Sequence, residues 1–473
     1  MQTKLFLRAA TIVMALVWIY SCQKTEMPDP AFSNARPPHA GFNENDMVLH
    51  WNENVSRVIS RSGGNPPIYA RHYTMTQLAV HDALNSIVPK YQTYALMNTR
   101  DKDADPDAAI AAAAYWTIKK IDAFLKTFPP GTTGLALQTS GNNWDGWYAA
   151  SLSQIPDGEG KTRGVALGMK AADAIMANRA NDGYAQARIV YVNGSGVIPA
   201  AGIYRPTIAQ NPPLLFPNTH TGGLPYWATN MKGFAVTSSD QFRSPAPPAL
   251  TSTEYAQDYN EVKTLGARVG STRTADQTLM ANYWQETPIN LWNRFARQAV
   301  LNKRMDAWRS ARLLALTNVA IFDGLLTVFD GIHHFYRWRP ESAIRSMQDD
   351  GNPATEGQAD WMPFVTDIKV GPPPQTSTPP IPDYPASNSA IGSAATELMR
   401  HFFGSDETNV DLVTEDVITA GTTRHFSSFS QAAKEYSDSR IYAGFTFRYS
   451  VDAGDELGRK VGKYSFESLL KEN

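Results

Sequence analysis

Apolar side chains recur every three or four residues along much of the chain, which is the spacing of an amphipathic α-helix. The pattern predicts helices over residues 69–86, 106–128, 160–179, 275–283, 291–329 and 390–403. Acidic residues and Pro106 mark the start of the second helix, and Gly404 follows the last, as is common at helix boundaries. No stretch shows the sustained apolar–polar alternation of a half-buried strand. We therefore expect a mostly α-helical fold.

Residues 307–329 are apolar around most of the helix circumference. The apolar positions are Leu313, Leu314, Leu316, Val319, Ala320, Phe322 and Leu326. A helix with this pattern is buried by neighbours on most sides. We expect it to run through the centre of the folded domain.

Two proline-rich stretches interrupt the helical pattern. Nine prolines fall within residues 193–252, and seven fall within residues 371–385. Loops of this length in a compact protein usually carry function or cover a surface. Composition alone does not distinguish these roles, so recognition of a glycan or a partner protein by these loops is one functional alternative.

The N-terminus has the pattern of a secretory signal. Lys4 and Arg8 precede the apolar run 9–19, and the small residue Ser21 stands just before Cys22. The apolar run is short compared with the roughly 20 residues of a membrane-spanning helix. Residues 19–22 resemble a bacterial lipobox, which implies that the cysteine is lipidated. The alternative is an ordinary secretory peptide with a chance cysteine.

This reading divides the chain into three parts. We expect a signal peptide over residues 1–21, a lipidated tether over residues 22–40 and a single folded domain over residues 41–473. The lipid on Cys22 would then anchor the protein to a membrane without spanning it. The expected location is the bacterial cell envelope, at the outer membrane.

Charge and cysteine content exclude several classes of protein. The chain has 43 Lys and Arg against 45 Asp and Glu, so it is not a globally basic nucleic-acid-binding protein, and we expect no nucleic-acid partner. Cys22 is the only cysteine, which rules out an internal disulfide and any cysteine-based metal site.

Three segments in the last third carry groups suited to an anion. Residues 337–345 hold three arginines, and an arginine fork binds oxyanions well. Residues 382–389 lead into a predicted helix, whose first backbone N–H groups favour anions. Residues 439–444 add Arg440. The alternative is structural, because arginines often pair with surface carboxylates, and Ser387 or Asn388 can serve as a helix cap.

Taken together, these segments resemble the vanadium-dependent haloperoxidases and their relatives, the type-2 phosphatidic acid phosphatases and bacterial acid phosphatases. The matching segments are residues 79–85, 311–316, Trp338-Arg339-Pro340, 343–345, Asp383-Tyr384-Pro385, 429–433 and Ser439-Arg440-Ile441-Tyr442. The resemblance implies a fold of packed helical bundles around an oxyanion pocket, with the motif region over residues 307–462. It also implies vanadate or phosphate as ligand, and it allows an oligomer.

The family motif is only partly present. The resemblance makes Arg339, Arg440 and Ser387 the oxyanion-binding candidates, the last at the position of the family's glycine. The family's lysine and serine are replaced by Ile332 and Ala386.

Both family histidines are missing as well. Asn388 stands at the position of the acid–base histidine, and Thr446 stands at that of the axial histidine, which bonds vanadium or attacks phosphorus. An asparagine does not exchange a proton near neutral pH, and a threonine is a poor ligand for vanadium. Losing even one donor to a transition state typically costs about 10²–10³ in rate. We therefore expect the family's ordinary reaction to be absent.

Two functional readings follow from this pattern, besides the surface-binding alternative. The favoured one is a homologue that binds an anion or a small molecule, or whose catalysis is altered. The other is an active haloperoxidase or phosphatase in which His333 and His334 substitute for the lost groups. Asp330 and His334 are spaced to share a metal, but they have no third ligand, so we expect no metal site. His81-Asp82 is interpreted as a packing contact.

Overall fold

The computed structural model describes most of the region predicted to fold. The described residues are 46–60, 66–127, 143–184, 200–205, 230–347, 349–365, 378–379, 381–416 and 418–473. Cys22, the predicted signal and the tether lie outside them, as do large parts of both proline-rich stretches. Residues from Glu44 to Asn473 form one compact unit.

The first group of helices contains α2 (Met47–Ser60), α3 (Pro66–Ile87), α4 (Pro106–Leu125), α5 (Trp144–Ser153) and α6 (Glu159–Asn178). As predicted, α4 starts after an acidic residue, because the Asp105 carboxylate accepts a hydrogen bond from Ala108 N at 2.8 Å. A run of buried alanines lets α6 approach α4 closely. Gly164 and Gly168 of α6 lie against the α4 backbone, where any Cβ would collide with it.

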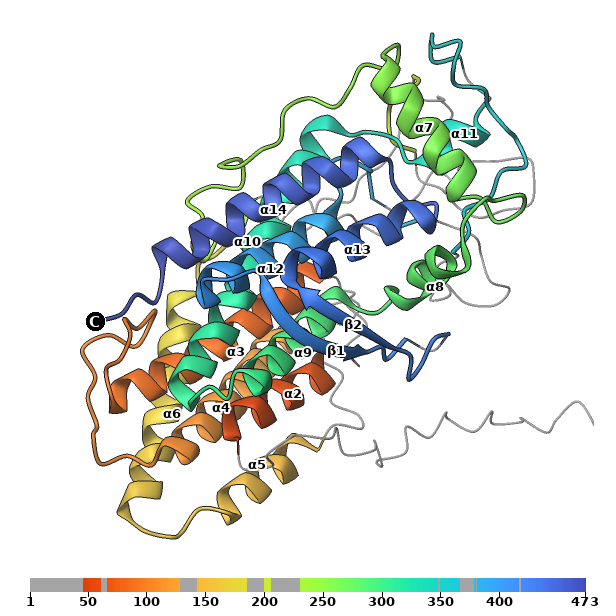
Figure 1. Ribbon diagram of the computed structural model, residues 1–473. Helices are drawn as coiled ribbons and strands as arrows, with labels where there is room; N and C mark the ends of the chain where they lie inside the picture. The colour runs from red at the N-terminus through yellow and green to blue at the C-terminus, as the bar shows by residue number, and fades with distance from the viewer. Residues whose placement is uncertain are drawn as a thin grey trace, which may run out of the picture. The chain divides into compact units, whose positions relative to one another are not determined.

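The second group contains α10 (Ala307–Phe335), α12 (Ser387–Phe403), α13 (Phe429–Tyr442) and α14 (Arg448–Ser468). Helix α12 packs against the other three, as Figure 1 shows. Glycines allow α14 to approach α12 closely, as they do for α6 and α4. Gly454, Gly458 and Gly462 of α14 lie directly on backbone carbonyl oxygens of α12.

An aspartate anchors a loop in the same way in each group. The Asp82 carboxylate of α3 accepts hydrogen bonds from three consecutive backbone N–H groups, those of residues 94–96. The Asp323 carboxylate of α10 accepts three from residues 234–236. The two loops meet where the Tyr94 hydroxyl donates to the Phe234 carbonyl at 3.2 Å. Each group therefore uses one buried aspartate to hold a loop through three consecutive backbone N–H groups.

Helix α10 is the central helix that the sequence predicts. The seven apolar positions named above are fully or almost fully buried, and α10 contacts α3 of the first group as well as α12 and α14 of the second. Among the described residues it is the one helix whose length and hydropathy would suit a membrane span. Its burial by other helices identifies it as a core helix instead.

The structure differs from the predicted elements in two places. The expected helix over residues 291–329 is two helices, α9 (Pro288–Asn302) and α10. They are separated at Asp306, whose side chain caps α10 by accepting from Arg309 N at 2.9 Å. An antiparallel hairpin of β1 (Glu407–Val413) and β2 (Thr423–Ser428), which the sequence analysis did not predict, follows α12.

The remaining elements are short. They are α7 (Thr253–Leu265), α8 (Ala275–Tyr283) and α11 (Pro340–Arg345). As predicted, α12 ends at Gly404, which has the positive φ of 67° typical of a helix C-cap.

Candidate functional site

Arg339 is the residue just before α11, and its guanidinium is buried. Each of its nitrogens faces an acceptor supplied by the chain itself. Nε donates to the Ile381 carbonyl at 2.6 Å, and Nη2 donates to the Pro382 carbonyl at 3.4 Å. Nη1 donates to the Phe445 carbonyl at 2.8 Å and lies 3.5 Å from Oδ1 of Asp383.

Asp383 supplies the negative charge beside Arg339. Its side chain is completely buried, and Oδ1 also accepts a hydrogen bond from the Thr446 hydroxyl. The other oxygen accepts from Phe447 N at 3.3 Å. Burial raises the pKa of Asp383 to about 6, against the opposing effects of Arg339 and Thr446. Thr446, at the position of the family's axial histidine, is therefore held by a carboxylate of this chain.

Three chain segments lie side by side at this point. Trp338 N donates to the Gly202 carbonyl at 3.0 Å, and Asp383 N donates to the Arg337 carbonyl at 2.9 Å. This arrangement places Tyr204 near Arg339, and burial raises the pKa of its phenol. The Tyr204 hydroxyl has no hydrogen-bond partner in the part of the chain that the structure describes. The sequence analysis missed Tyr204, because nothing in its local pattern distinguishes it.

Arg440 occupies the last turn of α13 and is also buried. Its Nε donates to the Ser439 hydroxyl at 3.0 Å, and its Nη2 donates to the Trp284 carbonyl. The guanidinium carbon lies 5.3 Å from the centre of the Tyr436 ring, and burial lowers the pKa of the guanidinium.

The peptide of Phe445 links the two arginine residues. Its N–H donates to the Arg440 carbonyl at 3.0 Å, and its carbonyl accepts from the Arg339 guanidinium. The two guanidinium groups, however, have separate sets of acceptors. Within the described ranges the structure brings Arg339 together with Thr446, through Asp383, but it turns Arg440 toward Trp284.

The start of α12 holds three further motif positions. Ala386 is the buried N-cap residue, and its N–H donates to the Ser450 carbonyl at 2.9 Å. Ser387 and Asn388 lie half-buried in the first turn. At the positions that the resemblance assigns to the family's serine and acid–base histidine, the chain therefore presents a methyl group and an amide.

The histidines near the former lysine position lie in a different environment. Ile332 is fully buried in α10, which is the environment an apolar side chain prefers. His333 follows it, and burial lowers the pKa of its ring to about 4 despite the nearby Asp330. His334 is exposed and packs edge-on against Phe335.

Asp330 is already paired and is not free to share a metal with His334. Its two carboxylate oxygens accept from Arg243 at 2.6 and 2.9 Å. No group of three metal-binding side chains occurs among the described residues. His81 and Asp82 make a local contact at 3.3 Å, in which the carboxylate is the loop anchor described above.

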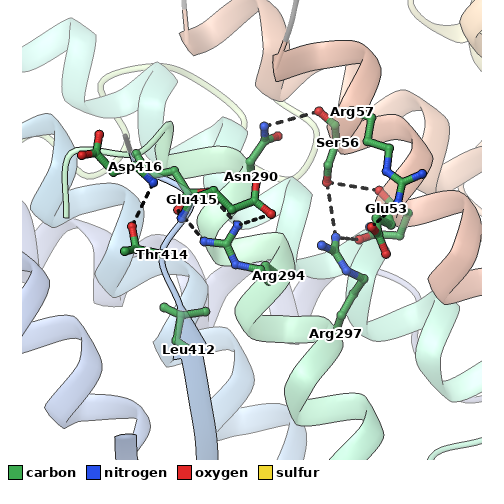
Figure 2. Close-up of polar contacts among 12 residues, drawn as sticks. Glu53, Ser56, Arg57, Asn290, Arg294, Arg297, Leu412, Thr414, Glu415 and Asp416 are labelled. Carbon is green, nitrogen blue, oxygen red and sulfur yellow. Dashed lines mark hydrogen bonds and ion pairs between the residues drawn. The ribbon is translucent and has the colours of Figure 1, made fainter. Parts of the chain in front are cut away.

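A second buried charge cluster, which the sequence analysis missed, ties α9 to its neighbours (Figure 2). Arg294 donates to both oxygens of Glu286 and lies 3.2 Å from Glu415. One turn later, Arg297 donates to Asn52 Oδ1 at 2.6 Å and Ser56 Oγ at 3.3 Å. The negative charges of Glu53 and Glu415 also act on Arg297. This cluster joins α2, α9 and the end of β1, so we interpret it as structural.

One cavity of about 270 Å³ lies between α12, α13 and α14. Its walls carry the ion pairs Arg400–Glu397 and Arg448–Asp438. The cavity is lined by none of the motif residues discussed above. It is therefore separate from the Arg339 site.

Comparisons with a family model, curated proteins and solved structures all find vanadium-dependent haloperoxidases. The family model described as the VCPO second helical-bundle domain matches residues 312–472. Among curated proteins, the vanadium chloroperoxidase of Curvularia inaequalis is 22% identical over 515 aligned residues, which cover 88% of this chain and 80% of the relative.

Solved structures show the same fold. A bacterial vanadium-dependent iodoperoxidase superposes with a TM-score of 0.69 at 19% identity, covering 90% of this chain and 97% of the other. A bacterial vanadium-dependent chloroperoxidase in its holo form gives a TM-score of 0.63 at 15% identity, covering 88% and 95%. The mostly helical fold predicted from sequence is thus confirmed, and residues 312–472 resemble the second helical-bundle domain of the vanadium chloroperoxidases.

Proposed function

We propose that this protein is a catalytically altered member of the superfamily that carries out neither vanadate-dependent halide oxidation nor phosphoester hydrolysis. One observation carries the proposal. Thr446, at the position of the residue that should bond vanadium or attack phosphorus, is buried and donates its hydroxyl to Asp383. This hydroxyl is already committed to a carboxylate of the chain and is not free to bond vanadium, and the ion pair with Arg339 weakens that carboxylate as a base.

The residues at this site do not fit vanadate. A charged oxyanion needs cations that are not already neutralised, but Arg339 is paired with Asp383, and Ile332 carries no charge. A carboxylate at this position would also repel an incoming oxyanion. Asn388 has a side-chain amide that neither gains nor loses a proton near neutral pH, so it does not serve as an acid or a base. The sequence favoured binding of an anion by both Arg339 and Arg440. The ion pair with Asp383 argues against a role for Arg339 in such binding.

Compensation by the neighbouring histidines is also poorly supported. His333 is neutral at ordinary pH because burial lowers its pKa to about 4, and His334 is exposed beside Phe335. Neither makes a described contact with Arg339, Asp383 or Thr446. Neither histidine is therefore a substitute for the lost family groups.

A turnover assay tests this proposal. We expect the purified protein, supplied with vanadate, hydrogen peroxide and either bromide or iodide, to halogenate an indicator no faster than a heat-denatured sample. We expect the same with an aryl phosphate ester. Turnover that disappears in Arg440→Ala and in His334→Ala would contradict the proposal and favour an active enzyme with substitute residues.

We further propose that the protein is anchored in the bacterial cell envelope through Cys22. The support is the sequence of residues 1–22 alone, with its basic start, short apolar run and lipobox-like end. Metabolic labelling with a tritiated fatty acid should mark the wild-type protein and not Cys22→Ala. Equal labelling of both would refute lipidation at this residue.

A further inference from the structure

We infer that the Asp383 carboxylate is a built-in anion: it occupies the ligand position of Arg339, so the site accepts a small external carboxylate once this side chain is removed. The inference rests on the proposed function, since it explains why the family's oxyanion does not fit. It goes further because it makes Asp383 the residue that determines which ligands the site binds.

The first support is the set of donors around Asp383. The Thr446 hydroxyl and Arg339 Nη1 both face Oδ1, and Phe447 N faces Oδ2 at 3.3 Å. A hydroxyl, a backbone N–H and a guanidinium that converge on two oxygens form a typical binding site for a carboxylate or other small oxyanion. Here the anion is covalently part of the chain.

The second support is the charge balance at Arg339. Among the described residues, Asp383 is the only carboxylate within ion-pair distance of this guanidinium. The nearby Glu341 is committed to Arg345 at 2.9 Å and to Thr378 N at 3.3 Å. Removing Asp383 would therefore leave a buried cation without a counter-charge, which is strongly unfavourable. A small anion that enters the vacated position would relieve this cost.

The third support is the fixed backbone on both sides of Asp383. Its N–H donates to the Arg337 carbonyl, and its carbonyl accepts from the Ser450 hydroxyl at 2.6 Å. Because these contacts do not involve the carboxylate, they hold the segment in place when the side chain is shortened. An alanine at this position leaves a space the size of the lost carboxyl group, with the same surrounding hydrogen-bond donors. Formate has this size.

Isothermal titration of the full-length protein with sodium formate tests this inference. Asp383→Ala should bind one formate at least tenfold more tightly than the wild type, whose position is filled. The double variant Asp383→Ala with Arg339→Gln should return to wild-type behaviour, because the cation is gone. Formate binding that is no stronger in Asp383→Ala than in the wild type, or that is equal in the double variant, would overturn the inference.

Asp323→Ala is a matched control. Asp323 is just as buried and also has a pKa raised to about 6, but its carboxylate is held by backbone N–H groups, and among the described residues no arginine forms an ion pair with it, although the charge of Arg179 acts on it from farther away. Equal formate binding by this variant would show that Arg339 plays no part, and would contradict the inference.

If Asp383→Ala does not fold, Asp383→Ser serves in its place, since its short side chain still leaves most of the carboxylate position open. Its melting temperature should rise when formate replaces gluconate at constant ionic strength, and that of the wild type should not. An unchanged melting temperature in Asp383→Ser would again overturn the inference. The failure of the inference and that of the proposed function can be told apart, because halide oxidation by the wild type would refute the proposed function, whereas unchanged formate binding in Asp383→Ala would refute the inference.

Discussion

At the scale of single residues, the buried carboxylate of Asp383 pairs with Arg339, one of the two arginines that match the family motif. This pairing leaves Arg339 less available to an external anion. The sequence analysis identified Arg339, Arg440 and the substitutions at Asn388 and Thr446, because these are read directly from spacing. It did not assign a role to Asp383, although this residue lies within a matching segment. The role of Asp383 depends on its ion pair with Arg339, which lies 44 residues away in sequence. Such a contact is visible only in three dimensions.

The pH dependence of stability gives a test of the Asp383 environment. Its pKa is about 6 in the folded protein, against about 3.9 in an unfolded chain, so the protonated form suits the fold better. The contribution of Asp383 to the free energy of unfolding is therefore greatest below about pH 4, declines as the pH rises to 6, and stays low above it. The full decline is about 2–3 kcal/mol.

Asp383→Asn should lose this decline, because an amide does not titrate. Urea unfolding of both proteins at several values between pH 4 and 7 measures it. Asp323 and Asp258, whose pKa values are also raised to about 6, contribute equally to both proteins and cancel in the difference. A difference in free energy of unfolding that is constant across this range would contradict the assigned environment.

At the scale of elements, small residues decide how closely the helices of each group pack. The sequence predicted where most helices lie, since a helical period and caps such as Gly404 are local signals. It did not predict the break between α9 and α10, because apolar residues continue at helical spacing on both sides of Asp306. The β1–β2 hairpin was missed because only a short part of each strand alternates between buried and exposed side chains.

Gly458→Ala tests the contact between α14 and α12. An alanine in place of glycine usually stabilises a helix by about 1 kcal/mol. Here its Cβ would collide with the Ala390 carbonyl oxygen, so we expect a loss of about 1–3 kcal/mol in the free energy of unfolding. Lys460→Ala, at an exposed position of the same helix, should change it by less than about 0.5 kcal/mol. A stabilised Gly458→Ala would show that the helices are not in close contact.

At the scale of the whole molecule, α10 joins the two groups of helices. Its pattern of apolar residues on most sides was read correctly from the sequence as central. The role of Asp323 as a loop anchor was not, because the backbone N–H groups that it accepts from lie 87 to 89 residues away in sequence.

Because α10 contacts both groups, damage to it should affect the domain as one unit. Leu316→Ala removes a fully buried side chain and should cost about 2–5 kcal/mol. Circular dichroism and tryptophan fluorescence should report the same lowered midpoint in urea. Two separate transitions, with only one of them shifted, would indicate that the groups unfold independently.

The central claim is that Arg339, which the resemblance assigns to an oxyanion site, is already neutralised by Asp383 of the same chain. Isothermal titration with vanadate measures it most directly, with Asp383→Ala as the comparison. The account predicts no saturable binding of vanadate by the wild type at concentrations up to about 1 mM, which corresponds to a binding free energy weaker than about −4 kcal/mol. Saturable binding of one vanadate by the wild type in the micromolar range, weakened by Arg339→Gln, would contradict it.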